Sequence, residues 1–276
     1  MRMNFPNRHR LNLSPNSRAL VENADLVLGL EVPDFYGLVN RISRQLEYSS
    51  QLITKAKLAC ISAGDRLAKS NYQDFQRYQP VDLDLAADAE ATMPSLVEAV
   101  KKRMTGDRRR VFEARGAEYA KQHAAMREKA RVDASYAWDA SPVSVARMCA
   151  EIWAQIKNED WCLVNGSTNF LSNWPLRLWN FDKSYRHIGS SGGAGMGYGA
   201  PAAVGAALAN KKYGRVSVNI QTDGDLMYAP GVLWTAAHHR IPLLTIMHNN
   251  RAYHQELMEV QIAANQHNRG IDRAHI

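Results

Sequence analysis

The sequence predicts an α/β protein built from two layered units with mainly parallel sheets. Short apolar runs alternate with longer segments of helical periodicity, which is typical of parallel strands covered by helices. A segment rich in Arg, Lys, Glu and Ala interrupts this alternation at residues 105–140. These observations predict a first α/β unit over residues 1–104, a basic helical linker over 105–140 and a second α/β unit over 141–276.

Three strands are expected in the first unit. Each is a short apolar run, and the runs lie at residues 24–30, 57–62 and 81–85. Helical patterns occur at residues 39–48 and 92–104. Because an average sheet has about 5–6 strands, the first unit is expected to be incomplete at its N-terminal side.

The linker carries the excess positive charge of the whole chain. The chain has 34 Lys and Arg and 27 Asp and Glu, and residues 101–131 alone hold 11 of the former and 4 of the latter. The remaining residues are therefore balanced, at 23 and 23. Charge confined to one helix indicates an exposed linker, so we expect no nucleic-acid partner.

The second unit alternates more regularly. Pro142 and Pro201 each stand near the start of a predicted helix, where the missing N–H of proline is harmless. Helices are expected at residues 141–157, 201–211 and 231–239, strands at 161–164, 215–221 and 242–247, and a glycine-rich loop at 189–199.

Cysteine usage and hydropathy indicate a cytoplasmic protein. The three cysteines, at 60, 149 and 162, are far apart and odd in number, so neither a disulfide framework nor a zinc site is expected. No apolar run approaches the ~18 residues of a membrane span, and the first residues contain no apolar stretch typical of a signal peptide. We therefore expect no membrane partner.

Glycine is unusually dense at residues 189–199, which predicts that the backbone approaches a ligand or a neighbouring chain closely. Gly195, Gly197 and Ala200 also match part of the dinucleotide-binding fingerprint, with Asp223 as the ribose acceptor. The segment before Gly195 is a poor strand, however, and a loop that only packs closely remains an alternative.

Two polar positions follow predicted strands of the second unit. Asp223 comes after the strand at 215–221, and Asn250 after the strand at 242–247. Ligands gather at the carboxyl ends of parallel strands, and carboxylate and amide oxygens suit Mg²⁺ that also binds phosphate oxygens. A helix that begins after Asp223 would direct its N–H groups at the same phosphates.

Three ordered motifs resemble the thiamine-diphosphate enzymes of the acetolactate synthase, benzoylformate decarboxylase and pyruvate decarboxylase superfamily. Asp223-Gly224 and Asn249-Asn250 stand at the spacing of its GDG and NN signature, residues 195–206 resemble its GxMGxxxPAAxGA segment, and residues 163–168 resemble its first cofactor loop. The resemblance implies that residues 1–104 are the latter part of a Rossmann-like central domain. It also implies that residues 141–276 are a C-terminally incomplete diphosphate-binding domain, and that the pyrimidine-binding domain has no counterpart here.

The resemblance also assigns roles to residues. It implies Mg²⁺ ligation by the side chains of Asp223 and Asn250 and by the carbonyl of Ala252, and support of the bent cofactor by Met196. Thr222 departs from the first glycine of GDG, and Asp225 stands where a small hydroxyl residue is common. The implied cofactor-binding residues are Ser167, Thr168, Gly195, Met196, Gly197, Gly224 and Asp225.

The function implied is that of the thiamine-diphosphate- and Mg²⁺-binding part of a 2-oxo acid decarboxylase or carboligase, a lyase or transferase similar to acetolactate synthase. No catalytic residue is expected in this chain, because the activating glutamate of the family lies in the pyrimidine-binding domain. The isolated chain is therefore expected to be inactive and to act as a homo-oligomer or with a separate pyrimidine-domain chain. FAD binding stays open. The alternatives are a non-catalytic cofactor-binding or assembly subunit and a dinucleotide oxidoreductase, and the latter leaves Asn249-Asn250 unexplained.

Overall fold

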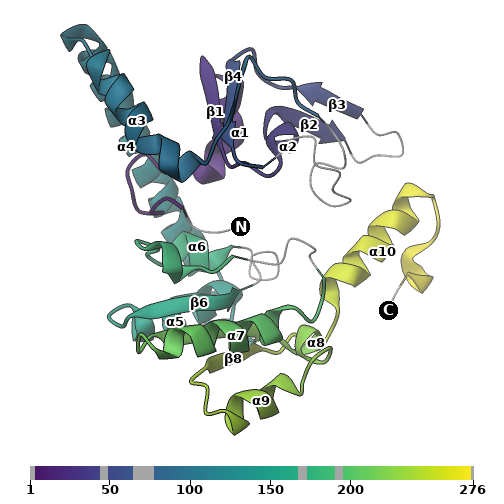
Figure 1. Ribbon diagram of the computed structural model, residues 1–276. Coiled ribbons are helices and arrows are strands. Elements are labelled where there is room, and N and C mark those ends of the chain that lie inside the picture. Colours follow the sequence, from purple (N-terminus) through teal and green to yellow (C-terminus); the bar gives the residue numbers. More distant parts are fainter. Residues whose placement is uncertain (1–3, 44–48, 65–77, 167–172, 190–194, 275–276) are drawn as a thin grey trace. The chain divides into compact units, whose positions relative to one another are not determined.

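A computed structural model describes residues 4–43, 49–64, 78–166, 173–189 and 195–274 (Figure 1). The chain divides into two compact units. The N-terminal unit is Leu13–Tyr119, and the C-terminal unit combines Met1–Asn12 with Ala120–Ile276. The first residues of the chain therefore group with its C-terminal half.

The N-terminal unit is built on a three-stranded parallel sheet of order β1-β4-β5, here called the N-terminal sheet. Its three strands confirm the three predicted apolar runs. Val27 and Leu58 are buried in the core beneath the sheet together with Phe35 and Val39. The elements of this unit are η1 (Ser14–Asn16), α1 (Ser17–Glu22), β1 (Leu26–Leu30), α2 (Phe35–Val39), β2 (Asn40–Ser43), β3 (Ser49–Leu52), β4 (Lys57–Ser62), β5 (Leu83–Ala86) and α3 (Ala89–Lys102).

The helix predicted at residues 39–48 is wrong over residues 40–43, and residues 44–48 lie outside the described residues. The helical turn is α2, which Asp34 caps by accepting a hydrogen bond from the Gly37 N–H. At Asn40 the backbone becomes extended, with φ −120° and ψ 146°, and β2 pairs with β3 in antiparallel fashion. Strand pairing with a segment ten residues away has thus overridden the local helical spacing.

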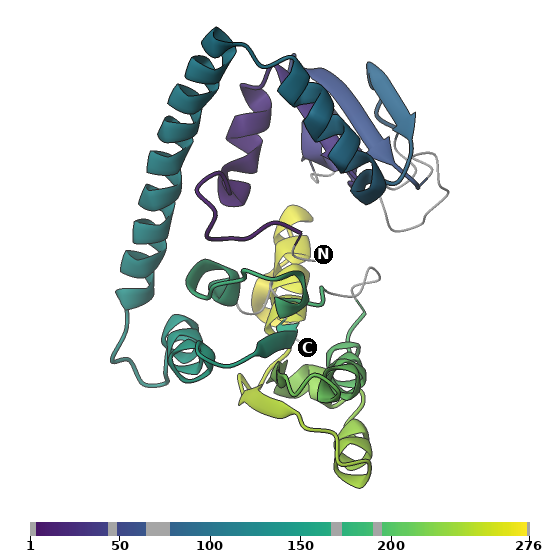
Figure 2. The ribbon, with the colours of Figure 1, turned by 60° about the vertical axis from the view of Figure 1, so that its left-hand side comes forward.

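Helix α4 (Gly106–Ser135) occupies most of the predicted helical linker and is one continuous helix (Figure 2). Most of its first half is exposed. Within the C-terminal unit, His123 is buried and its Nδ1 lies 2.8 Å from the Asn12 carbonyl oxygen. The second half of α4 is therefore a packed element as well as a connection.

The C-terminal unit is built on a parallel sheet of order β6-β7-β8, here called the C-terminal sheet. These strands confirm the three predicted in the second unit. Its elements are α5 (Val145–Ile156), β6 (Trp161–Gly166), α6 (Trp174–Leu178), η3 (Ser184–Arg186), α7 (Gly199–Lys211), β7 (Val216–Thr222), α8 (Asp223–Leu226), α9 (Val232–His238), β8 (Leu244–His248), α10 (His254–Gln266) and η4 (Ile271–Arg273).

Two helix starts differ from the prediction. Helix α5 begins at Val145 rather than near Pro142, because the Ser144 side chain caps it by accepting from the Arg147 N–H at 3.2 Å. Helix α7 begins at Gly199, two residues before Pro201. The helix expected directly after Asp223 is the single turn α8, which α9 follows.

Both faces of the C-terminal sheet are covered, as expected for parallel strands. On one face, Leu163 packs with Trp161, Trp179 and neighbouring residues of α5. On the other face, Cys162 and Val164 pack against α7 (Figure 1). The alternation of neighbouring residues between two apolar cores fixes the register of β6.

The first residues of the chain are tied to the C-terminal unit by Asn7. Its Nδ2 donates to the carbonyl oxygens of Leu176 at 2.9 Å and Trp179 at 3.0 Å, and its Oδ1 accepts from the Phe181 N–H at 2.9 Å. This one side chain thus satisfies three backbone groups around α6. Among the described residues, no helix combines the length and apolar character needed to cross a membrane.

Candidate functional site

The site lies where β7 and β8 end side by side. The last paired residues of the two parallel strands are Thr222 and His248. Asp223 is the first residue after Thr222 and Asn250 is the second after His248, so the predicted juxtaposition of the two motifs is confirmed. Open parallel sheets collect ligands at this edge.

Hydrogen bonds join the two motifs. The Asp223 Oδ1 accepts from the Asn250 N–H at 3.1 Å, and its Oδ2 accepts from the Arg251 N–H at 3.1 Å. The Asn250 Oδ1 accepts from the Ala252 N–H at 3.3 Å. The carboxylate, the amide oxygen and the backbone of Ala252 are therefore held in one short loop.

These oxygen donors fit a small divalent cation in kind. One carboxylate, one amide and one carbonyl leave the remaining positions of an octahedron to phosphate oxygens and water, which is how Mg²⁺ binds in many nucleotide and phosphate sites. Over the part of the chain that the structure describes, no three His, Cys, Asp or Glu residues gather into a metal-binding group. The donor set therefore suits Mg²⁺ with a phosphate ligand and does not suit zinc.

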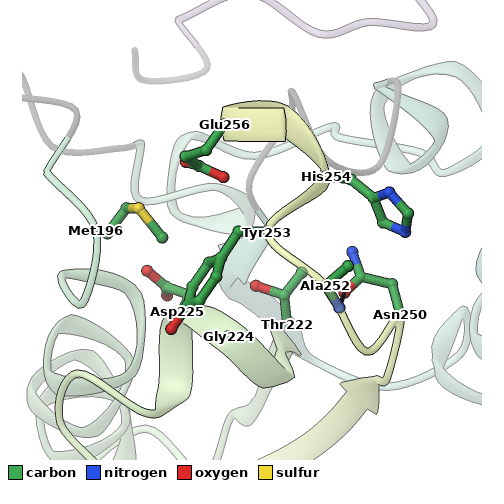
Figure 3. Close-up of a pocket in the computed structure, with 9 residues that line it drawn as sticks. All are labelled: Met196, Thr222, Gly224, Asp225, Asn250, Ala252, Tyr253, His254 and Glu256. Carbon is green, nitrogen blue, oxygen red and sulfur yellow. Dashed lines mark hydrogen bonds between the residues drawn. The ribbon is translucent and has the colours of Figure 1, made fainter. Parts of the chain in front are cut away.

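A pocket of about 260 Å³, part of it open to solvent, adjoins this loop. Because this volume includes open solvent, the pocket is a shallow surface that one part of a ligand can contact. Figure 3 shows Tyr253 in its centre, with Met196 and Asp225 on one side and Asn250 and His254 on the other. The lining residues are Met196, Thr222, Gly224, Asp225, Asn250, Ala252, Tyr253, His254 and Glu256.

Gly224 has a packing role in addition to the role implied by the motif. A Cβ at this position would lie 2.8 Å from the Cε1 of Tyr253, so only glycine lets the ring pack against this turn. The Tyr253 ring in turn meets the Tyr228 ring edge to face, with centroids 6.3 Å apart. Glycine here supports the aromatic wall of the pocket.

The Met196 segment is held by Asp225. The Gly197 N–H donates to the Asp225 Oδ1 at 2.5 Å, and the Asp225 Oδ2 accepts from the Gln221 Nε2 at 2.6 Å. Gly197 has φ +83°, and a Cβ there would lie 2.6 Å from the Cβ of Tyr228. The unusual carboxylate at position 225 therefore binds the loop that carries Met196.

The structure describes eight of the ten predicted site residues and brings seven of them together, which are Met196, Gly197, Asp223, Gly224, Asp225, Asn250 and Ala252. Six of them surround the Asp223 loop or line the pocket. Gly195 is exposed, and its Cβ position has no atom within 4 Å. Ser167 and Thr168 lie outside the described residues.

Tyr253 and Glu256 are pocket residues that the sequence analysis missed. They follow Asn250 by three and six residues, at the start of α10. Their closeness to the NN motif was the available signal. His248, the last residue of β8, is half-buried, and this burial lowers its pKa. The charge of His254 also lowers this pKa, whereas the Asp223 carboxylate raises it.

The dinucleotide interpretation lacks its structural context. The fingerprint requires a strand directly before the glycines. In residues 183–189, the described part of the segment before Gly195, the structure has the 3-10 turn η3 and a single bridge between His187 and Leu163 instead of a strand. Residues 190–194 lie outside the described residues. Asp223, its proposed ribose acceptor, is engaged by the loop that carries Asn250.

Comparisons with known proteins agree with the geometry. Residues 170–274 match the family model described as thiamine pyrophosphate enzyme, C-terminal TPP binding domain. Benzoylformate decarboxylase of Pseudomonas aeruginosa is 42% identical over 59 residues, which are 21% of this chain and 11% of that protein. Acetolactate synthase 2, chloroplastic, of Brassica napus is 35% identical over 78 residues, which are 28% of this chain and 12% of that protein.

Solved structures show the same fold. The thiamine diphosphate-dependent 4-hydroxybenzoylformate decarboxylase of Rhodococcus jostii RHA1 superposes with a TM-score of 0.59 at 20% identity. The superposition covers 96% of this chain and 44% of that one. The chain therefore spans less than half of that solved protein, and both units take part in the likeness.

Proposed function

Because this chain is a relative of the thiamine-diphosphate-dependent enzymes of the acetolactate synthase and benzoylformate decarboxylase type, we propose that its C-terminal unit binds thiamine diphosphate through Mg²⁺. The ion would be held by the side chains of Asp223 and Asn250 and the carbonyl of Ala252. The chain would serve as the diphosphate-binding part of a 2-oxo acid decarboxylase or carboligase.

One observation carries this proposal. Asp223 and Asn250 are 27 positions apart in sequence, yet the Asp223 carboxylate accepts the Asn250 N–H at 3.1 Å at the end of the parallel sheet. A carboxylate and an amide oxygen are thereby brought into reach of one ion beside a pocket. No apolar packing requirement explains this pair of polar side chains.

The residues around the loop have separable tasks. Met196 and Tyr253 offer apolar surfaces to the ligand, and Asp225 holds the Met196 segment in place. Thiamine diphosphate, when bound, supplies the electron sink for the carbanion formed from a 2-oxo acid. Glu256 places a carboxylate at the rim of the same pocket (Figure 3).

The remainder of the active centre is part of the proposal. The pocket beside Asp223 and Asn250 is proposed to take the diphosphate end of the cofactor, so a surface for the pyrimidine end is needed as well. We propose that a separate pyrimidine-domain chain provides it, in the cytoplasm. A homo-oligomer of this chain is the other proposed assembly, and it would need the same domain. The substrate would be a 2-oxo acid.

Calorimetric titration with thiamine diphosphate tests the metal role. The full chain should bind with saturating Mg²⁺ and lose most of its affinity in EDTA. Asn250→Ala should weaken binding about 10- to 100-fold, because it removes a ligand of the ion. Asn249→Ala is the matched control, since this exposed neighbour is not a proposed ligand, and it should bind as the parent chain does. Equal affinity with Mg²⁺ and with EDTA contradicts the proposal.

A second assay separates an enzyme subunit from a non-catalytic binding subunit. Pyruvate consumption and acetolactate formation are measured for the chain alone and with a pyrimidine-binding domain of a relative added in trans or fused to it. Turnover that appears only in the combined sample, and disappears with Asn250→Ala, supports the enzyme subunit. Tight cofactor binding without turnover in any combination supports the non-catalytic alternative.

A further inference from the structure

Strand β7 carries a buried polar stripe that the proposed function does not use. Ser217, Asn219 and Gln221 alternate along the strand and are 2%, 2% and 0% exposed. Strands of a parallel sheet covered on both faces are normally apolar throughout. Buried amides are costly unless they are hydrogen-bonded, so this stripe requires a physical reason.

We propose that the amides of this stripe form a hydrogen-bonded chain that positions the Met196 segment at the pocket, with Gln221 and Asp225 as its positioning residues. The importance of Met196 to the cofactor rests on the proposed function. The hydrogen-bonded chain itself rests only on the geometry of the C-terminal sheet.

The chain of bonds crosses all three strands. The Asn219 Nδ2 donates to the Thr245 Oγ1 on β8 at 3.3 Å, and the Asn219 Oδ1 accepts from the Asn165 Nδ2 on β6 at 2.8 Å. The same Asn165 Nδ2 lies 2.8 Å from the Gln221 Oε1. Gln221 then donates to Asp225, which accepts the Gly197 N–H.

Two groups that can only accept hydrogen bonds, the Ile220 carbonyl and the Asp225 carboxylate, stand on either side of Asn165 and Gln221. They determine which atom each of these two amides presents to its neighbour. At one end the Ile220 carbonyl oxygen lies 3.3 Å from the Asn165 Nδ2, so the amide of Asn165 must present its nitrogen. Gln221 must then turn its oxygen to Asn165 and its nitrogen to position 225. Position 225 therefore needs a group that accepts from both sides, and a carboxylate is such a group.

The hydrogen-bonded chain ends on Gly197, a residue that has no side chain to anchor it. Gly197 has φ +83° and can be held only through its backbone, which the Asp225 Oδ1 does. Two residues later, a Cβ at Gly199 would lie 2.7 Å from the Asn165 Nδ2, so Asn165 also packs against the start of α7. The amide chain thus contacts the segment after Met196 at two points.

Exchanging the acceptor and the donor between positions 221 and 225 tests the inference. In Asp225→Asn, the new amide must turn its oxygen to the Gly197 N–H, so its NH₂ group would face the NH₂ group of Gln221. Gln221→Glu places two carboxylates together. The double variant Asp225→Asn with Gln221→Glu restores the alternation of donors and acceptors, so it should recover what each single variant loses.

The primary measurement is amide hydrogen exchange at Gly197 in the ligand-free full chain. Each single variant should accelerate this exchange about 10- to 100-fold, the equivalent of one hydrogen bond to a charged group. The double variant should regain most of the protection. Affinity for thiamine diphosphate with Mg²⁺, measured by calorimetry, should fall and recover in parallel.

Asn210→Ala is the matched control. Asn210 is also buried on α7 and donates to Ser217 of the same strand at 3.0 Å, but no bond connects it to Gly197. It should lower the melting temperature and leave Gly197 exchange unchanged.

Unchanged Gly197 exchange in both single variants, or a double variant that exchanges as fast as the faster single one, overturns the inference. If the parent chain binds no thiamine diphosphate, the proposed function fails while the exchange data still decide this inference.

Discussion

The N-terminal and C-terminal sheets have the same topology and end in different chemistry. Each is a three-stranded parallel sheet with an acidic residue directly after a strand, Glu31 after β1 and Asp223 after β7. Glu31 accepts from the N–H groups of Ala63 at 3.0 Å and Ala89 at 3.1 Å and from the Ser62 hydroxyl at 3.0 Å. These bonds, the one from Ala63 first, lower the pKa of Glu31.

Asp223 also accepts two backbone N–H groups, but they belong to the loop that carries the second oxygen donor. Glu31 therefore joins strand and helix ends to one another, whereas Asp223 gathers groups beside a pocket. The comparison teaches that a carboxylate at the end of a parallel strand is not a site by its position. Its neighbours decide whether it serves the fold or a ligand.

The largest expected effect comes from substituting the two carboxylates, Asp223 and Glu31, by amides. Asp223→Asn should reduce the affinity for thiamine diphosphate and Mg²⁺ about 10- to 100-fold, because an amide holds a divalent cation less strongly than a carboxylate. Glu31→Gln should leave that affinity within experimental error and lower the melting temperature. Calorimetry and thermal unfolding of both variants measure the two effects. A similar loss of affinity in Glu31→Gln would contradict the division of tasks.

The next effect concerns one glycine with a close neighbour in each of the two units. Gly197→Ala should destabilise the protein by about 1–2 kcal/mol through its positive φ alone, and should also weaken cofactor binding. In β1, Gly29→Ala would bring a Cβ to 2.7 Å from the Cε2 of Phe35 of α2, so it should reduce stability without changing affinity.

Gly205→Ala serves as the control for these glycine variants. Gly205 lies inside α7, and its Cβ position has no atom within 4 Å. Alanine there should raise stability by about 0.5–1 kcal/mol. Chemical denaturation with calorimetry of the same samples checks all three changes, and a Gly29→Ala variant with impaired binding would weaken the comparison.

A third expected effect is a difference in acid sensitivity. Burial lowers the pKa of His187 in the C-terminal unit to about 4, and its Nδ1 accepts from the Gly189 N–H at 2.7 Å. Because the unfolded chain binds this proton near pH 6.5, stability should fall as the pH falls from about 6.5 to about 4, by about 1–3 kcal/mol. The contribution of Glu31, whose pKa is lowered, is lost only as the pH falls below its usual value of 4.5.

Tryptophan fluorescence separates the two units in this experiment. All six tryptophans lie in the C-terminal unit, so urea unfolding followed by their emission reports that unit. His187→Asn keeps an acceptor for Gly189 and removes the titration, and it should therefore flatten the pH dependence between 4 and 6.5. An unchanged slope would show that another group is responsible.

The sequence alone predicted the strands of both sheets and the position of the site between β7 and β8. Each of these features depends on signals that are local in the chain. Apolar runs are buried in any parallel sheet, and polar residues directly after such runs must lie at its carboxyl edge. Asp223 and Asn250 could therefore be paired without knowledge of the remaining contacts.

Other features depended on contacts that no local pattern encodes. The helical spacing gave way at residues 40–43 to the pairing of β2 with β3. The alternation of Ser217, Asn219 and Gln221 is typical of a strand with one face in water, yet α7 buries that face. Whether a polar side chain meets solvent or another amide is decided by what covers it.

The sequence by itself thus determined which residues could form strands and which oxygens stand at their ends, because periodicity and strand direction follow from the chain. Only the tertiary structure decided that Asp225 holds Gly197, that Gly224 accommodates Tyr253 and that residues 4–12 pack with the C-terminal unit. These are contacts between segments far apart in the chain or on facing elements. Their free energy depends on distance and burial, which the order of residues does not specify.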